Sequence, residues 1–115
     1  FIIASSSFRS ARYLLEGLEI SPDNMKKNIN QTKGLIVAEG VMMALAPHIG
    51  RQVAHDLVYD CCRKSIKNNI LFIDTLLSEN DISKIFNKNE LLDIINPKNY
   101  LGAAPAMASR LLKNR

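Results

Sequence analysis

Apolar side chains recur at spacings of three and four residues along most of the chain, which is the period of a helix that buries one face. Within residues 4–18 the apolar positions are Phe8, Ala11, Leu14, Leu15 and Leu18. Within residues 51–67 they are Val53, Ala54, Leu57, Val58, Cys61, Cys62 and Ile66. No segment of useful length alternates apolar and polar residues as a half-buried strand does. The pattern therefore predicts an all-α fold.

The most hydrophobic stretch covers residues 35–46, where only Glu39 and Gly40 interrupt a run of aliphatic side chains and methionines. A helix that is apolar nearly all round is typical of a buried position, so this segment is predicted to be the central helix. Thr32 is placed to cap its beginning. Pro47 is expected to end it, because proline disfavours helical backbone in the residue before it.

Shorter helices are expected on both sides of this segment. Ser21, Pro22 and Asp23 form a typical helix start, in which serine caps free N–H groups, proline suits the first turn and aspartate complements the helix dipole. Further helices are predicted over residues 71–77, after caps at Asp81 and Asn89, and over residues 104–112. Together these segments predict a compact bundle of about five to seven helices around the central one.

The composition agrees with one helical domain built on an aliphatic core. The chain has 115 residues, of which 47% are hydrophobic and 6% aromatic, and its net charge is +4. Its basic groups are Lys26-Lys27, Arg63-Lys64, and Arg110, Lys113 and Arg115 near the C-terminus. None of them forms the dense basic cluster typical of nucleic-acid binding, so we expect no nucleic-acid partner. No apolar run is long enough to predict a membrane span.

Two adjacent cysteines and two histidines are the residues that could carry redox or metal chemistry. Neighbours on a helix point about 100° apart, so Cys61 and Cys62 cannot easily bridge each other. His48 and His55 do not share a metal-ligand spacing with them. The cysteines are therefore predicted to be free, buried thiols of a cytoplasmic protein. We expect His48 to face solvent and His55 to bond a neighbouring carboxylate.

Glu39 is the polar residue that most needs an explanation, since burying an unpaired carboxylate in an apolar helix costs free energy. Two interpretations stay open: an ion pair or exposed strip within this domain, or support of a site at the junction with another domain. Met42 and Met43 are interpreted as core-filling side chains. The chain has no glycine-rich phosphate loop and no nucleophile elbow. Hence no catalytic, cofactor-binding or metal-ligating residue is assigned, and no cofactor is expected.

Three segments of the chain resemble a known family. They are residues 23–46, with Asn24-Met25, Thr32-x-Gly34-Leu35 and Ala38-Glu39; residues 50–58, with Gly50-Arg51-x-x-Ala54-His55; and residues 96–105. The pattern is similar to the C-terminal domain of the adenylosuccinate lyase and carboxymuconate cycloisomerase branch of the fumarase/aspartase superfamily. Residues 96–105 look more like the cycloisomerases. One departure is Ala108-Ser109-Arg110, where the cycloisomerases are expected to have an acidic residue before the arginine.

The resemblance implies an enzyme of three helical domains that assembles as a homotetramer through a bundle of long middle-domain helices. Each active site would gather residues from several subunits, with a serine on a mobile middle-domain loop as the general base. An oxyanion-type site would stabilise an enolate-like intermediate. In the cycloisomerases a substrate carboxylate adds across a double bond and closes a lactone in aromatic catabolism. The implied partners are a small dicarboxylate or tricarboxylate substrate and further copies of the subunit, in the cytoplasm.

On this interpretation residues 1–20 are the end of a middle-domain helix and residues 21–115 are the C-terminal domain. The chain opens on Phe1-Ile2-Ile3 without a capping sequence, as if inside a helix. The serines at positions 5–7 do not match the Gly-Ser-Ser-x-Met-Pro pattern of the catalytic loop. The chain alone is therefore expected to be inactive. Two alternatives stay open: an adenylosuccinate lyase, and a free-standing helical interaction module.

Overall fold

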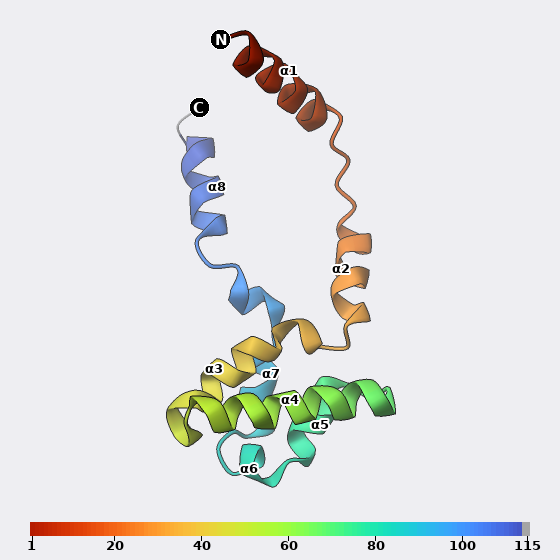
Figure 1. Ribbon diagram of the computed structural model, residues 1–115, viewed down its shortest axis with the longest axis vertical. Helices are drawn as coiled ribbons and strands as arrows, with labels where there is room; N and C mark the ends of the chain where they lie inside the picture. Colours follow the sequence, from red (N-terminus) through yellow and green to blue (C-terminus); the bar gives the residue numbers. More distant parts are fainter. Residues whose placement is uncertain (114–115) are drawn as a thin grey trace.

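The computed structural model describes residues 1–113, and every regular element in them is helical (Figure 1). The α-helices are α1 (Ile2–Glu16), α2 (Pro22–Gln31), α3 (Ala38–Ile49), α4 (Arg51–Asn68), α5 (Phe72–Ser78), α6 (Asn80–Ser83), α7 (Lys88–Ile94) and α8 (Ala104–Lys113). Two 3₁₀ turns, η1 (Leu35–Val37) and η2 (Pro97–Tyr100), lie between α2 and α3 and between α7 and α8. The predicted all-α class is confirmed, with a slightly larger number of helices than expected.

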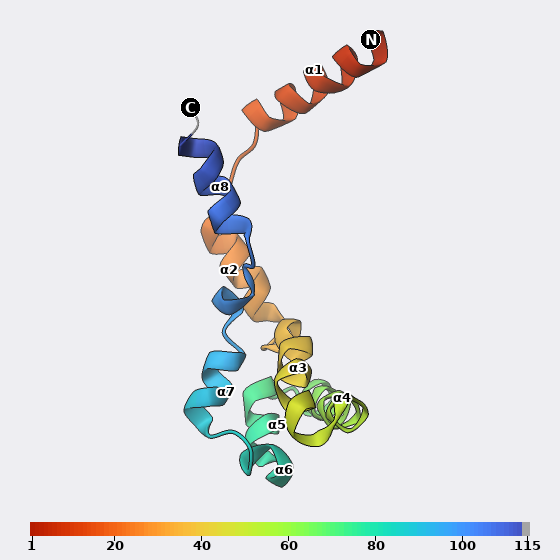
Figure 2. The same ribbon diagram turned by 90° about the vertical axis from the view of Figure 1, so that its left-hand side faces the viewer.

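The core lies where α3 and α4 pack against each other and against α5, α6 and α7, at one end of the molecule (Figure 2). Its buried side chains are Val41, Leu45, Ala54, Val58, Cys61, Phe72, Leu76, Ile82 and Leu91. They are aliphatic apart from one phenylalanine and one cysteine, as the composition predicts. Gly50 joins α3 to α4 with a φ of 85°, a backbone conformation that a side chain would disfavour.

The predicted central helix is central, but its bounds and burial differ from the sequence prediction. Residues 35–37 form the 3₁₀ turn, and α3 then continues through Pro47 to Ile49 instead of ending before the proline. Pro47 costs the helix one hydrogen bond, which would have gone to the carbonyl of Met43. Met43 lies on the exposed side, where water can take the place of that donor. Of the two adjacent methionines interpreted as core, Met42 is half-buried and Met43 is 54% exposed.

The stripe that α4 buries is narrower than its apolar pattern suggests. Its buried residues are Ala54, Val58, Cys61 and Ser65. Val53 and Ile66 were expected in the stripe, but both are exposed because they flank the face that meets α3 and α5. Ser65 takes a buried position instead, and its hydroxyl donates a hydrogen bond of 2.8 Å to the carbonyl of Ile70. That bond satisfies a polar group that the pattern alone would have placed in solvent.

Two predicted helix caps are each two residues away from their predicted positions. α7 begins after Asn87, not after Asn89, and α6 begins after Glu79, not after Asp81. The Asn87 side chain accepts from the backbone N–H of Glu90, and the Glu90 carboxylate accepts from the backbone N–H of Asn87. This reciprocal capping box satisfies two free donors at once, which a cap at Asn89 could not do. The arrangement fixes where α7 starts.

α1, α2 and α8 bury no residue. They extend from the core as two arms, one formed by α2 and α1 and the other by α8, toward the same end of the molecule (Figures 1 and 2). The radius of gyration is 19.7 Å, whereas a compact chain of this length has one of about 13 Å. The compact bundle predicted from the sequence is thus formed by α3 to α7, and the arms reach beyond it. The predicted domain boundary near residue 20 falls in the connection between α1 and α2, and it stays a prediction.

The α2 arm is fixed to the core at the corner formed by Lys33 and Gly34, whose positive φ values of 52° and 94° turn the chain. The carbonyl of Lys33 accepts a 3.0 Å hydrogen bond from the backbone N–H of Phe72. The Lys33 ammonium group donates 2.8 Å to the carbonyl of Asn69 and also bonds the Asn69 side chain. The backbone carbonyl and the ammonium group of Lys33 therefore both bind residues 69–72, where α4 ends and α5 begins.

Candidate functional site

Glu39 lies in the first turn of α3 and is exposed. Among residues 1–113 it forms no ion pair, so the exposed-strip interpretation describes its place within this chain. A carboxylate in the first turn also complements the positive end of the helix dipole. Glu39 nevertheless borders two hollows of the surface, one toward α4 and one toward η2. It is the residue around which the candidate site is arranged.

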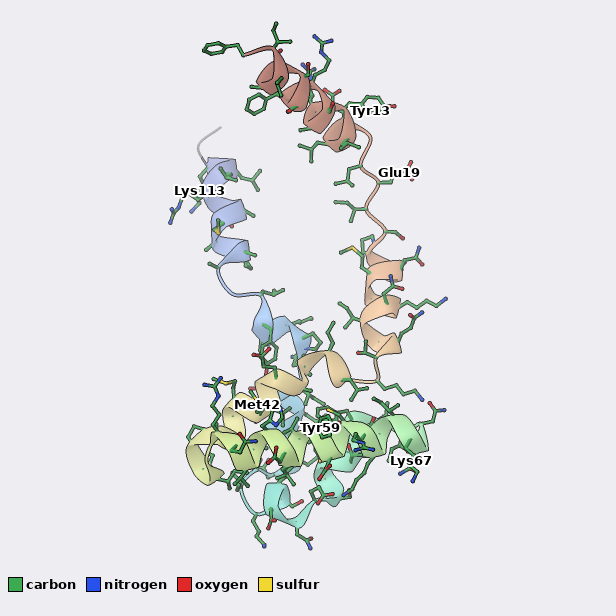
Figure 3. All side chains as sticks on the ribbon, viewed as in Figure 1. Tyr13, Glu19, Met42, Tyr59, Lys67 and Lys113 are labelled. Carbon is green, nitrogen blue, oxygen red and sulfur yellow. The ribbon has the colours of Figure 1, made fainter. Side chains whose placement is uncertain are left out.

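The first hollow lies between α3 and α4 and has a volume of about 300 Å³. It is lined by Ala38, Glu39, Met42, His55, Val58, Tyr59 and Cys62. Met42 and Tyr59, both labelled in Figure 3, come from its two sides. The fold thus brings together four residues that the sequence singled out separately: Glu39, Met42, His55 and Cys62. Tyr59 was not singled out, although its place four residues after His55 on one helix face could have signalled it.

His55 begins a short row of stacked groups on the exposed face of α4. Its Nδ1 lies 3.0 Å from the Asp56 carboxylate, as the sequence predicted for a histidine bonded to a neighbouring acid. Hydrogen bonds from His55 and from Gln52 lower the pKa of Asp56. The His55 ring is nearly parallel to that of Tyr59, with centroids 6.4 Å apart, and the Arg63 guanidinium lies 5.7 Å from the Tyr59 centroid. These contacts fix the His55 ring against the Asp56 carboxylate and the ring of Tyr59.

The two cysteines are free thiols, with Cys61 buried and Cys62 half-buried. Burial raises the pKa of Cys61 to about 11, and it raises the pKa of Cys62 as well. A thiol with a raised pKa stays protonated at neutral pH and is a poor nucleophile. The prediction of free, buried thiols is confirmed for Cys61, whereas Cys62 is free and only half-buried.

The second hollow opens between α3, α2 and η2, with a volume of about 510 Å³. It is lined by Ile29, Ile36, Val37, Glu39, Gly40, Met43, Pro97 and Tyr100. Tyr100 crosses Gly40 so closely that a Cβ at position 40 would overlap the phenol ring. Its hydroxyl donates a 2.5 Å hydrogen bond to the carbonyl of Ile94. Gly40 and Tyr100 were not predicted as a pair, and the only signal in the sequence was a glycine inside a very apolar helix.

The remaining candidates lie apart from these hollows. His48 is exposed as expected, and its ring meets the edge of Phe86 with centroids 5.4 Å apart. The serines at positions 5–7 are exposed on α1, where Ser7 donates to the carbonyl of Ile3. The basic groups are spread over α2, α4 and α8; Lys67 and Lys113, labelled in Figure 3, are far apart. Arg115 lies outside the described residues.

Within residues 1–113, no three His, Cys, Asp or Glu side chains are grouped closely enough to hold a metal ion. No helix in the same part of the chain is long and apolar enough to cross a membrane. Around Glu39, the described residues form two open, mostly apolar hollows that share its carboxylate. Such surfaces are suited to contact with another part of a protein more than to a chemical step of their own.

A helical core with exposed apolar arms, as residues 1–113 form it, defines a class of protein, an all-helical domain. Residues 34–111 match the family model described as "Adenylosuccinate lyase C-terminus". The chain therefore belongs to this family and is a C-terminal domain of the fumarase/aspartase superfamily. The resemblance stated from the sequence is confirmed at this level.

Relatives with several activities match the chain over most of its length. It is 40% identical to trans-aconitate decarboxylase 1 of Mycosarcoma maydis, over 94% of this chain and 22% of the relative. It is 37% identical to 3-carboxy-cis,cis-muconate cycloisomerase of Pseudomonas aeruginosa, over 96% and 24%. It is also 37% identical to adenylosuccinate lyase of Methanocaldococcus jannaschii, over 84% and 21%.

A solved structure shows the same fold. The fumarate lyase from Mesorhizobium sp. BNC1 aligns with a TM-score of 0.81 and 43% identity, over 91% of this chain and 25% of that protein. The chain thus spans about a quarter of the length of its relatives. The relatives share the domain family, and the activities in their names differ.

Proposed function

We propose that the chain is the C-terminal domain of a 3-carboxy-cis,cis-muconate cycloisomerase, acting in aromatic catabolism. The observation that carries this proposal is the match to the Pseudomonas cycloisomerase over 96% of the chain. The match to an adenylosuccinate lyase at equal identity covers less of it, 84%. Residues 96–105, which look more like the cycloisomerases, support the same choice.

A tricarboxylate substrate is supported by a second relative. Trans-aconitate and 3-carboxymuconate are both unsaturated acids with three carboxyl groups, and the trans-aconitate decarboxylase is 40% identical to this chain. In a cycloisomerase reaction, one substrate carboxylate oxygen forms a bond to an alkene carbon, and a proton adds to the neighbouring carbon. That proton comes from an acidic group of the enzyme or from water, and the step changes no overall oxidation state, so neither a redox cofactor nor a second organic reactant is required. The enzyme has to align the carboxylate with the alkene and stabilise charge beside the other carboxyl groups.

The part proposed for this chain is structural, because no described side chain forms a nucleophile–base pair. α1 supports its place in a helical assembly. Its apolar residues Ala4, Phe8, Ala11 and Leu15, followed by Leu18, are spaced alternately by four and three, as in the seam of a coiled coil. All of them are exposed in this chain. We propose that α1 joins further helices of the whole enzyme and that the enzyme is a homotetramer.

The free thiols Cys61 and Cys62 support a reducing compartment, and we propose that the enzyme is cytoplasmic. The reaction is tested by assaying the whole protein on 3-carboxymuconate, trans-aconitate and adenylosuccinate. Loss of the ultraviolet absorbance of the conjugated diene is expected with the first and no turnover with the other two. Turnover of adenylosuccinate alone would replace the proposal with the purine enzyme, the second candidate. Turnover of trans-aconitate alone would replace it with a decarboxylase.

A further inference from the structure

The second hollow continues into a third, and together they form one groove at the base of the two arms. The third hollow lies between α2 and η2 and has a volume of about 560 Å³. It shares Ile29 and Pro97 with the second, which shows that the two are continuous. We call this the arm groove; it runs from Met43 of α3 to Pro22 of α2.

We propose that the arm groove docks an amphipathic helix from the part of the same enzyme that this chain does not span. The inference rests on the proposed function in one respect only, namely that the whole protein has further helices. The relatives are about four times longer than the chain, which spans 22% to 25% of them. A helix with one apolar face is the element that fills an elongated apolar groove.

The floor of the groove is apolar and open to solvent. Met25, Met43 and Ile36 are each more than half exposed, and they are joined by Ile29. Large side chains that gather on one surface without a cover mark a contact surface. Because methionine is flexible, two of these side chains can adapt to the residues of an incoming helix.

The charges at the rim of the groove predict where the docked helix carries acidic and basic residues. Lys26 of α2 and Lys98 of η2 line the hollow at one end, and no acidic side chain lines it. Glu39 lines the hollow at the other end, where no basic side chain is present. A complementary helix therefore carries acidic residues near Lys26 and Lys98 and a basic residue near Glu39. This ion pair gives Glu39 the junction role that the sequence left open.

The η2 wall of the groove is held in place before anything binds. Tyr100 is seated over Gly40 and bonded to the carbonyl of Ile94. Asn96 caps the turn by accepting a 3.1 Å bond from the backbone N–H of Lys98, and Pro97 fixes its own φ. A wall that is already ordered loses little conformational entropy when a partner helix docks.

The test compares thiol labelling in this 115-residue chain and in the whole protein. Cysteine is placed in the groove with Ile29→Cys and, separately, Met43→Cys, and the rate of maleimide labelling is measured. The parent proteins, which retain Cys61 and Cys62, give the baseline. Labelling of both groove positions is expected to be at least about tenfold slower in the whole protein, since burial restricts access of the reagent. Lys88→Cys on α7, outside the groove, serves as the control and is expected to change less than about twofold.

The charge complementarity is tested in the whole protein that carries Met43→Cys. The pair Lys26→Glu and Lys98→Glu is expected to speed labelling several-fold, because like charges then face each other. Lys27→Glu reverses one lysine charge next to the lining residue Lys26, outside the lining, and is expected to leave the rate unchanged. Equal labelling of groove positions in the two proteins would overturn the inference. So would slow labelling in the chain alone that is relieved by dilution, because the occupant would then be a second copy.

The labelling result does not depend on which substrate the whole protein turns over. A whole protein that protects the groove but converts none of the three acids would remove the proposed function and keep the inference. A whole protein that converts 3-carboxymuconate and leaves the groove open to labelling would do the reverse.

Discussion

At the scale of single residues, Gly40 decides how η2 rests on α3. A glycine within a helix costs about 1 kcal/mol relative to alanine, so its presence needs a reason. The reason is the phenol ring of Tyr100, which occupies the space that a Cβ at position 40 would take. Burial and the nearby Asp93 raise the pKa of Tyr100, so its hydroxyl remains a hydrogen-bond donor to Ile94 at neutral pH.

The energetic coupling between Gly40 and Tyr100 can be measured with a double-mutant cycle. Gly40→Ala alone is expected to lower the free energy of unfolding or leave it unchanged, because displacing Tyr100 offsets the gain in helix propensity. In a Tyr100→Ala background the same substitution is expected to be stabilising by about 0.5 to 1 kcal/mol. Urea unfolding of the four proteins gives the coupling. An equal effect of Gly40→Ala in both backgrounds would show that the ring and the glycine are independent.

The buried thiol of Cys61 makes stability depend on alkaline pH. Its pKa is raised from 9.0 to about 11 in the folded chain. Between these values the unfolded state loses a proton that the folded state keeps, so the free energy of unfolding falls as the pH rises from 9 to 11. The loss is about 1 to 3 kcal/mol. Below pH 9 the thiol is protonated in both states, and its contribution to the free energy of unfolding is fully present.

Urea unfolding at pH 8 and at pH 10.5 checks this expectation. The parent is expected to lose more stability over this range than Cys61→Ala, which has no thiol to titrate. The raised pKa of Lys64, which pairs with Glu79, adds a loss at still higher pH in both proteins. Identical pH profiles of the parent and Cys61→Ala would rule out the thiol as the cause.

At the scale of elements, the start of α7 depends on a pair of side chains and not on one. The Asn87 side chain accepts from the N–H groups of Asn89 and Glu90. Asn87→Ala is expected to lower the free energy of unfolding by about 1 kcal/mol. Asn89→Ala, the position that the local sequence favoured, is expected to cost less than about 0.5 kcal/mol. Chemical denaturation of both variants compares them directly, and equal losses would contradict the capping box.

The two sides of α3 should likewise differ in their sensitivity to substitution. Leu45 is completely buried and Met43 is 54% exposed, although they are two residues apart in the same hydrophobic run. Leu45→Ala is expected to cost about 2 to 5 kcal/mol, because it leaves a cavity in the core. Met43→Ala is expected to cost less than about 1 kcal/mol in this chain. Thermal or urea unfolding distinguishes the two, and a large loss for Met43→Ala would mean that the groove side of α3 is covered.

At the scale of the whole molecule, the chain is a compact core with two uncovered arms. The arms supply large apolar side chains, such as Phe8, Leu15 and Leu111, but none of these is buried. Apolar surface of this extent gains free energy only when it is covered by other residues. In the proposed enzyme, further helices would provide that cover.

The expected activity follows from this form. The 115-residue chain is expected to show no turnover of 3-carboxymuconate, trans-aconitate or adenylosuccinate, because no nucleophilic hydroxyl or thiol side chain among residues 1–113 is hydrogen-bonded to a side-chain base. The whole protein assayed at the same molar concentration is the positive control. Turnover by the chain alone, above a buffer blank, would show that a catalytic group within it has been overlooked.

The sequence alone determined the helical class and the main helices, because helical periodicity and capping residues are local signals. It indicated the family separately, through the resemblance of residues 23–46, 50–58 and 96–105 to known proteins. It also placed the helix of residues 51–67 within one residue of α4. Only the tertiary structure decided that α3 continues through Pro47, that Ser65 is buried while Ile66 is exposed, and that Tyr100 lies over Gly40. Each of these depends on which neighbours a face meets across many residues of sequence. The free energy of such contacts is set by packing and hydrogen-bond partners that no local pattern contains.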